Sequence, residues 1–209
     1  MVAAYQKYLE GDALGLSTPT TEIKRAMEQY GQSGLHLDGH SRGSLTIGNA
    51  LESKAKEDQA QGSLSGTTVS FFGPAYNAAK ADGLLGVLQN REATADVQVK
   101  LDSVLKFQNH VADPVGTYVG DNPATGGTIP EGSTVLGEMH RAISGKRGTS
   151  HNCYGEPKGG GNCDSLWKSD VPKTLPANQT RDQRGGSSAR EVFDFLVYFR
   201  LCSVWLRIS

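Results

Sequence analysis

The chain has 209 residues, a length typical of one domain, and its charge is nearly balanced, with 21 Lys and Arg against 22 Asp and Glu. This balance leaves no excess of positive charge to attract phosphate groups, so we expect a protein that does not bind nucleic acid. A hydrophobic content of 37% together with 26 glycines indicates a small core and many turns.

Neither end of the sequence carries a recognisable export or membrane signal. The first residues lack a basic segment followed by an apolar one, so we expect no signal peptide. The apolar run over 192–208 is interrupted by Asp194, Arg200 and Arg207 and is shorter than a bilayer requires. We therefore expect no transmembrane helix.

The three cysteines, Cys153, Cys163 and Cys202, show no CxxC pair or other spacing typical of a zinc site. We expect neither a metal nor an organic cofactor. The odd count favours unpaired thiols, and a Cys153–Cys163 disulfide is the alternative for a chain that works outside the cytosol.

The first part of the chain follows a pattern of helix, strand and helix. Two short helices are predicted for residues 1–31, the second beginning at Thr20 or Thr21. The alternating run 35–38 predicts a strand, and apolar residues at spacings of three and four predict an amphipathic helix over 42–58.

The same pattern then recurs, with a strand predicted over 67–72, a helix over 75–90 and a strand over 104–111. Strands that alternate with helices indicate an α/β fold with a small, mostly parallel sheet and flanking helices. Residues 116–134 are rich in Gly, Pro and Thr and predict a long loop, either a lid or a plain connection, before a short helix over 135–143.

We expect three parts along the chain. Residues 1–155 form the α/β domain, and 156–190 form an irregular segment rich in Gly and Pro. The apolar tail 191–209 has two alternative roles, as an appendage foreign to the domain or as a late edge strand or helix.

The pentapeptide Gly39-His40-Ser41-Arg42-Gly43 has the pattern of a nucleophile elbow, a tight turn from strand to helix that exposes a Ser. The positions two before and two after the Ser must be small, because Cβ atoms there would clash with the strand and the helix. Gly39 and Gly43 meet this requirement, so Ser41 is the candidate nucleophile. The alternative is a Gly-Ser loop that merely connects a strand to a helix.

This turn and its context resemble the α/β-hydrolase fold, whose lipases and esterases often carry a His before the Ser, as His40 stands here. The resemblance covers residues 34–155 and implies a triad in the chain order Ser, acid, His. Asp113, followed by Pro114 after a predicted strand, is similar to the family's acid. An ordinary strand-ending Asp is the alternative reading, and Asp121 is the alternative acid.

The base must follow the acid in that order, which leaves His140 and His151. His151 lies in a loop of small polar residues, where bases of this fold are found, whereas His140 lies on a predicted helix. The resemblance then implies that His151 removes the proton of Ser41 and that Asp113 orients the imidazolium. It also implies that the backbone N–H of Arg42 contributes to the oxyanion hole.

The region before the elbow departs from the family, which places two or more strands and an oxyanion-forming loop there. Only residues 1–34 precede the elbow strand here, and Gly11, Gly15 and Ser17 are the candidates for a second oxyanion donor. We expect either a minimal α/β-hydrolase-like domain or a truncated one, the C-terminal piece of a longer protein.

A second resemblance is to the C-terminal regions of large bacterial haemagglutinin-type exoproteins, including contact-dependent growth-inhibition toxins. It is carried by residues 36–51 (HLDGHSRGSLTIGNAL) and 148–155 (GTSHNCYG). It implies a lipase- or esterase-like effector that is secreted or delivered within a larger exoprotein, with a small-molecule or lipid ester as substrate. A cognate immunity protein and a membrane surface are the partners implied.

Two other functions stay open as alternatives. A catalytically incomplete fragment would act as an interaction module, which the short N-terminal part favours. A nuclease built on His140 or His151 with Lys146 and Arg147 is disfavoured by the balanced charge.

Overall fold

The computed structural model describes residues 18–90, 105–145, 147–154, 163–167, 175–176 and 203–208. The first predicted helix, the candidate oxyanion donors Gly11, Gly15 and Ser17, and Cys202 lie outside the described residues. None of the described helices is long and apolar enough to cross a membrane.

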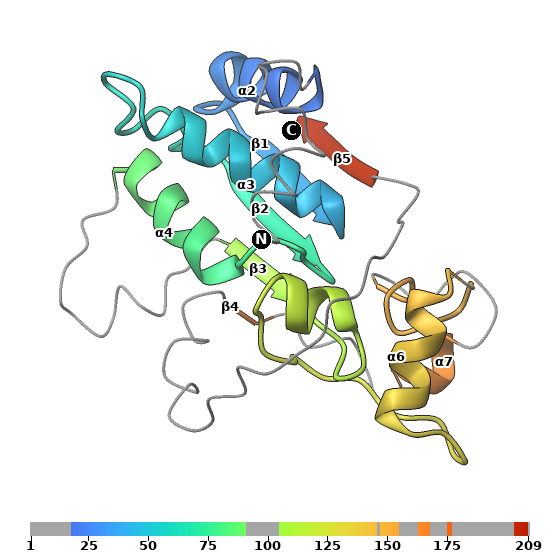
Figure 1. Cartoon of the computed structure of the whole chain (residues 1–209). Helices are drawn as coiled ribbons and strands as arrows, with labels where there is room; N and C mark the ends of the chain where they lie inside the picture. Colours follow the sequence, from blue (N-terminus) through green and yellow to red (C-terminus); the bar gives the residue numbers. More distant parts are fainter. Residues whose placement is uncertain are drawn as a thin grey trace, which may run out of the picture.

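A sheet of five strands in the order β4-β3-β2-β1-β5 forms the centre of the molecule (Figure 1). Its three inner strands, β1 (Leu35–His40), β2 (Thr68–Phe72) and β3 (Leu105–Gln108), run parallel. The two edge strands, β4 (Leu175–Pro176) and β5 (Ser203–Ile208), run antiparallel to their neighbours. The mostly parallel α/β sheet predicted from the sequence is therefore confirmed.

Three helices accompany the inner strands: α2 (Thr18–Tyr30), α3 (Arg42–Lys54) and α4 (Ala78–Leu88). All three match predicted helices, with shifted ends. The first begins two or three residues before the predicted start at Thr20 or Thr21, and α3 ends four residues earlier than predicted. The start of α4 is set by Asn77, whose side chain accepts a hydrogen bond from the backbone N–H of Lys80.

The core lies where α3 packs on β1 between α2 and α4. Along β1 and β2 every second side chain is buried, as in Leu35 and Leu37 of β1 and Phe71 of β2. This alternation is the one that predicted strands from the sequence. It directs the apolar residues of each strand into one layer shared with the helices.

The segment after β3 is more structured than predicted. The strand ends at Gln108, not at residue 111, and a π-helical turn, η2 (Val115–Val119), replaces the start of the expected loop. The rest of that loop is tied to the body by Asn122, whose side-chain amide donates to the backbone oxygens of Pro74 and Tyr76. This buried anchor makes a freely moving lid over the whole of 116–134 incompatible with the structure.

Two helices and two strands complete the described chain. The helix α6 (Val135–Ile143) has the predicted bounds, and α7 (Cys163–Leu166) is a single turn (Figure 1). Both α7 and β4 lie in the segment 156–190 that was predicted to be irregular. In the apolar tail, β5 pairs with the whole length of β1, so of the two roles left open the edge strand is the one observed.

We predict that Phe71→Ala lowers the free energy of unfolding by about 3–5 kcal/mol, because it empties a fully buried site in the middle strand of the sheet. Urea denaturation followed by circular dichroism measures the loss. The control is Val87→Ala on α4, which is 48% exposed and should change stability by less than about 0.5 kcal/mol. Equal effects of the two substitutions would contradict this placement of the core.

Candidate functional site

Ser41 occupies the turn between β1 and α3 in an unusual backbone conformation. Its φ of 51° and ψ of −119° lie outside the regions that residues with a side chain normally adopt. The turn is fixed by hydrogen bonds from the Ser41 N–H to the Phe72 oxygen (3.1 Å) and from the Ser44 N–H to the Ser41 oxygen (3.1 Å). Such a conformation costs on the order of 1–3 kcal/mol and is concentrated at functional sites.

The glycine at the end of β1 makes this turn sterically feasible. A Cβ atom on Gly39 would stand 2.9 Å from both the Ser44 nitrogen and the Ile47 Cδ1 atom, where there is no room for it. Gly43 lies buried in the first turn of α3. The strand, tight turn and helix predicted around Ser41 are thus all present.

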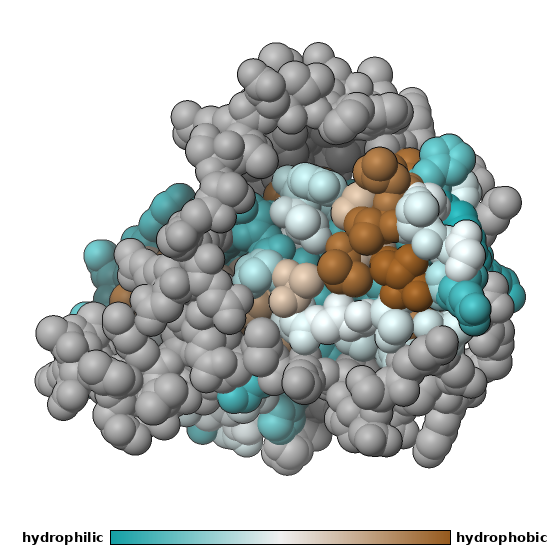
Figure 2. Space-filling view, turned by 90° about the horizontal axis from the view of Figure 1, so that it is seen from below, coloured by the Kyte–Doolittle hydropathy of each residue, from teal (hydrophilic) through white to brown (hydrophobic). Residues whose placement is uncertain are grey.

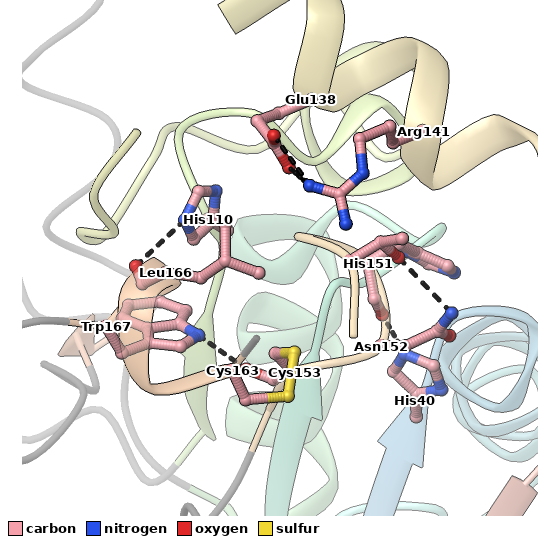
Figure 3. Close-up of a disulfide and its surroundings, with 11 residues drawn as sticks. His40, His110, Glu138, Arg141, His151, Asn152, Cys153, Cys163, Leu166 and Trp167 are labelled. Atoms are coloured by element: carbon pink, nitrogen blue, oxygen red, sulfur yellow. Dashed lines mark hydrogen bonds and ion pairs between the residues drawn. A yellow bond between two sulfur atoms is a disulfide. The ribbon is translucent and has the colours of Figure 1, made fainter. Parts of the chain in front are cut away.

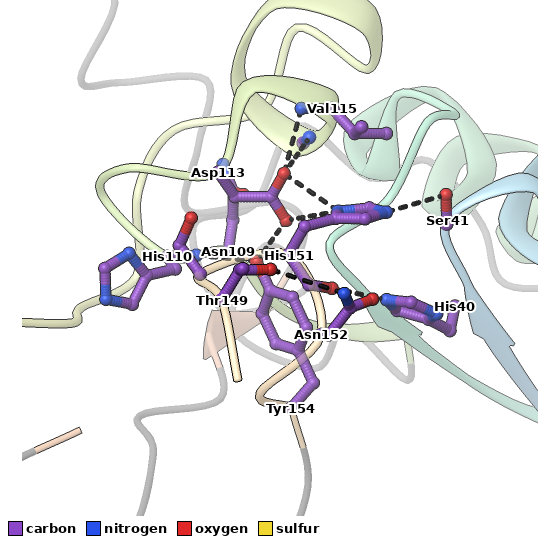
Figure 4. Close-up of polar contacts among 12 residues, drawn as sticks. His40, Ser41, Asn109, His110, Asp113, Val115, Thr149, His151, Asn152 and Tyr154 are labelled. Atoms are coloured by element: carbon purple, nitrogen blue, oxygen red, sulfur yellow. Dashed lines mark hydrogen bonds and ion pairs between the residues drawn. The ribbon is translucent and has the colours of Figure 1, made fainter. Parts of the chain in front are cut away.

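Ser41, His151 and Asp113 form one hydrogen-bonded chain (Figure 4). The Nε2 atom of His151 lies 3.0 Å from the Ser41 Oγ atom, and its Nδ1 atom lies 3.0 Å from each oxygen of the Asp113 carboxylate. All three residues are buried. Ser41 follows β1 and Asp113 follows β3. Because parallel strands end at the same edge of the sheet, the two residues come together there, and the loop 147–154 supplies His151.

The Asp113 carboxylate is completely buried and held by backbone and side-chain donors. Its Oδ1 atom accepts hydrogen bonds from the N–H groups of Val115 (2.8 Å) and Gly116 (3.3 Å) at the start of η2. Burial raises the pKa of Asp113. The facing His151 and the hydrogen bonds from Tyr154 and Gly116 together lower this pKa by more than burial raises it, so it lies below its usual value. The carboxylate is therefore ionised at neutral pH.

His40, the residue before Ser41, secures the loop that carries His151. Its Nε2 atom donates to the backbone oxygen of His151 at 2.7 Å, and the two imidazole rings lie 4.9 Å apart. Burial lowers the pKa of His40 and the neighbouring His151 lowers it further, so His40 is neutral at pH 7. Ser150 adds a second tie through its hydroxyl, which donates to the Ala112 oxygen at 2.7 Å.

A disulfide joins Cys153, in the loop that carries His151, to Cys163 at the start of α7 (Figure 3). The prediction of unpaired thiols was wrong, because the odd count of cysteines says nothing about which two the fold brings together. Trp167 adds to the same junction, as its indole N–H donates to the Cys153 oxygen at 2.5 Å. The disulfide and the indole attach α7 to the loop that holds His151.

The alternative site residues lie elsewhere. Asp121 is exposed in the turn after η2, and His140 is exposed on α6. Of the basic pair considered for a nuclease, Arg147 is exposed and Lys146 lies outside the described residues. Asp113 and His151, rather than these residues, are the ones that surround Ser41.

Arg42, the proposed oxyanion donor, is the first residue of α3. The N–H groups of a first helical turn have no acceptor within the helix, and the helix dipole favours negative charge there. An oxyanion formed at Ser41 would stand at this end of α3. In the described part of the chain no three His, Cys, Asp or Glu side chains are grouped so as to hold a metal ion.

Sequence reasoning identified the three central residues but missed their supports. Tyr154, whose hydroxyl donates to Asp113, and His40, as the anchor of the His151 loop, have no local pattern that signals these contacts. Their positions depend on the long-range return of the chain from residue 151 to residue 40.

Comparison of the chain with protein-family models, with curated proteins and with solved structures finds no match. The site is therefore interpreted from its own geometry.

We predict that Cys163→Ser lowers the free energy of unfolding by about 2–3 kcal/mol, because the disulfide closes a short loop of the unfolded chain. Denaturation with and without a reducing agent measures this. The reductant should destabilise the natural sequence and leave the Cys163→Ser variant unchanged. Cys202→Ser is the control and should behave like the natural sequence; loss of the reductant effect in that variant would contradict the Cys153–Cys163 pairing.

Proposed function

We propose that this chain is a serine ester hydrolase of the α/β-hydrolase type. The observation that carries the proposal is the hydrogen-bonded chain from Ser41 through His151 to Asp113, set on a positive-φ turn between a strand and a helix. Nucleophile, acid and base also follow one another along the sequence in the order typical of that fold.

In the proposed reaction a proton moves from Ser41 to His151 and is then returned. The Nε2 atom of His151 takes the Ser41 hydroxyl proton as Oγ attacks the ester carbonyl, and Asp113 stabilises the imidazolium formed. The backbone N–H of Arg42 donates to the oxyanion. The imidazolium returns the proton to the departing alkoxide, and a water molecule, activated by His151 in the same way, releases the acid from Ser41.

The acid and base are held ready for this reaction before substrate binds. Asp113 is ionised and accepts from the Nδ1 side of His151, which leaves the Nε2 atom as the acceptor that faces Ser41. Preorganised partners of this kind reduce the rearrangement needed to reach the transition state. The arrangement thus supports nucleophilic catalysis better than a purely structural role for Ser41.

An apolar ester, small or lipidic, is the substrate class that the surface favours. Figure 2 shows apolar residues gathered on the side of the molecule that faces down in Figure 1. Large exposed apolar side chains occur in η2, at Tyr118 and Val119, and at the start of α6, at Val135 and Leu136. Since η2 begins two residues after Asp113, this apolar surface adjoins the segment that holds the acid.

The proposal extends to a delivered effector, as the exoprotein resemblance implies, with lipid of a target membrane as substrate and a cognate immunity protein as partner. The Cys153–Cys163 disulfide supports function in an oxidising compartment, because cytosolic thiols are normally kept reduced.

We predict that the purified chain hydrolyses p-nitrophenyl butyrate and that Ser41→Ala or His151→Ala lowers kcat by at least about a thousandfold. Release of p-nitrophenol, followed by absorbance, measures this. The matched controls are Ser65→Ala and His140→Ala, which alter exposed residues and should keep full activity. A folded chain that turns over no ester would instead support the interaction module, and loss of activity in His140→Ala alone would overturn the choice of base.

We further predict that Leu136→Asp reduces hydrolysis of emulsified long-chain esters severalfold, because Leu136 is 76% exposed in the proposed lipid-facing surface. Turnover of soluble short-chain esters should stay unchanged. Val87→Asp on α4 is the control for an added charge at an exposed apolar position. An equal loss on both kinds of ester, or an equal loss in the control, would contradict a lipid-facing role.

A further inference from the structure

Tyr154 lies next to the disulfide, and its hydroxyl reaches the Asp113 carboxylate (Figure 4). The hydroxyl donates to the Oδ2 atom of Asp113 at 2.5 Å and accepts a hydrogen bond from the His110 backbone N–H at 2.9 Å. Burial raises the pKa of Tyr154 well above its usual value, and the nearby Asp113 charge raises it further. The hydroxyl therefore keeps its proton and acts as a donor.

The surroundings of the Tyr154 ring define where this hydroxyl stands. The ring packs against Trp167, with centroids 5.9 Å apart, and against His40, with centroids 5.8 Å apart. Gly73, which follows β2 with φ of 50°, leaves the space that the contact between Tyr154 and Asp113 needs. A Cβ atom at that position would stand 2.5 Å from the Asp113 Oδ2 atom and 2.8 Å from the Tyr154 Cε2 atom.

The donors around Asp113 are divided between its two oxygens. Backbone N–H groups of Val115 and Gly116 reach Oδ1, whereas the Tyr154 hydroxyl reaches Oδ2. A carboxylate whose two oxygens each accept a hydrogen bond cannot rotate about the Cβ–Cγ bond without losing one of these bonds. The plane of the carboxylate is thereby kept where both oxygens lie 3.0 Å from the Nδ1 atom of His151.

We propose that Tyr154 is a positioning residue that fixes the Asp113 carboxylate toward His151 in the ester-hydrolysing site. This inference rests on the proposed function of Ser41, Asp113 and His151. Tyr154 does not touch the reacting atoms; its effect reaches them through Asp113 and His151.

The first test is Tyr154→Phe, which removes the hydroxyl and keeps the ring. We expect kcat for p-nitrophenyl butyrate to fall roughly tenfold with KM little changed, since a hydrogen bond to a charged group is lost. The acid limb of the pH–rate profile should move to higher pH. Loss of the Tyr154 hydrogen bond leaves the negative charge of the carboxylate less stabilised, so the Asp113–His151 pair takes up a proton more readily.

The pH readout separates positioning from a purely structural contribution. Within the described ranges, the titratable side chains that interact with Asp113 are His151, Tyr154, His40 and His110. Of these four, His151 and Tyr154 hydrogen-bond to the carboxylate. Tyr30→Phe, which alters a tyrosine at the end of α2 outside the site, is the matched control and should change neither kcat nor the profile.

A second variant covers the case in which Tyr154→Phe fails to fold. Replacement of Tyr154 by 3-fluorotyrosine keeps the shape of the ring and makes the hydroxyl a stronger donor, so the acid limb should move to lower pH. Shifts in opposite directions for the two replacements support the inference. An unchanged profile in an active 3-fluorotyrosine protein would overturn it while leaving the proposed function intact, whereas a folded natural sequence without ester turnover would overturn both.

Discussion

The backbone turn at Ser41 is the constraint on which the site depends. The chain has to pass from β1 into α3 within one residue, and it does so at a positive φ that a serine adopts only when its surroundings compel it. The absence of a Cβ atom at Gly39 lets α3 come close enough to β1 for this turn to form. The pairing of β1 with β2 and β5 holds the strand end in place, so the sheet supports the strained residue from both sides.

A second requirement is that a distant loop return to this turn. His151 is 110 residues from Ser41, and its loop is tied down by His40, by Ser150 and by the disulfide two residues further on. These ties differ in chemistry but act on the same short stretch. Because His40 directly precedes Ser41, the turn that presents Ser41 also anchors the loop that carries His151.

Local patterns in the sequence were sufficient for the turn, whereas its two partners were implied by the resemblance to the α/β-hydrolase fold. The small residues around Ser41, the strand before it and the helix after it are features of neighbouring residues, and they predicted the geometry that is observed. Asp113 was chosen because it follows a predicted strand and precedes Pro114, as the acid of that fold does, and the structure places it within hydrogen-bond distance of His151. His151 was preferred to His140 because it lies in a loop, and the structure brings it to Ser41.

Features that depend on long-range contacts were predicted poorly. The strand β5 pairs with a segment far away in the sequence, so its apolar residues alone could not distinguish an edge strand from an appendage. The disulfide was missed because pairing depends on which cysteines the fold brings together. The third strand ends early because Asn109 turns out of the sheet to bond with the segment around Thr125, a partner that periodicity does not reveal.

The most direct test of the account is to find the atom that a fluorophosphonate probe modifies. The folded, oxidised chain is treated with the probe, digested and analysed by mass spectrometry. The account predicts one covalent adduct, on Ser41, and its near disappearance in a His151→Ala variant that retains the fold. A folded chain that stays unmodified, or an adduct on a different residue, would contradict the claim that Ser41, His151 and Asp113 form an active hydrolytic site.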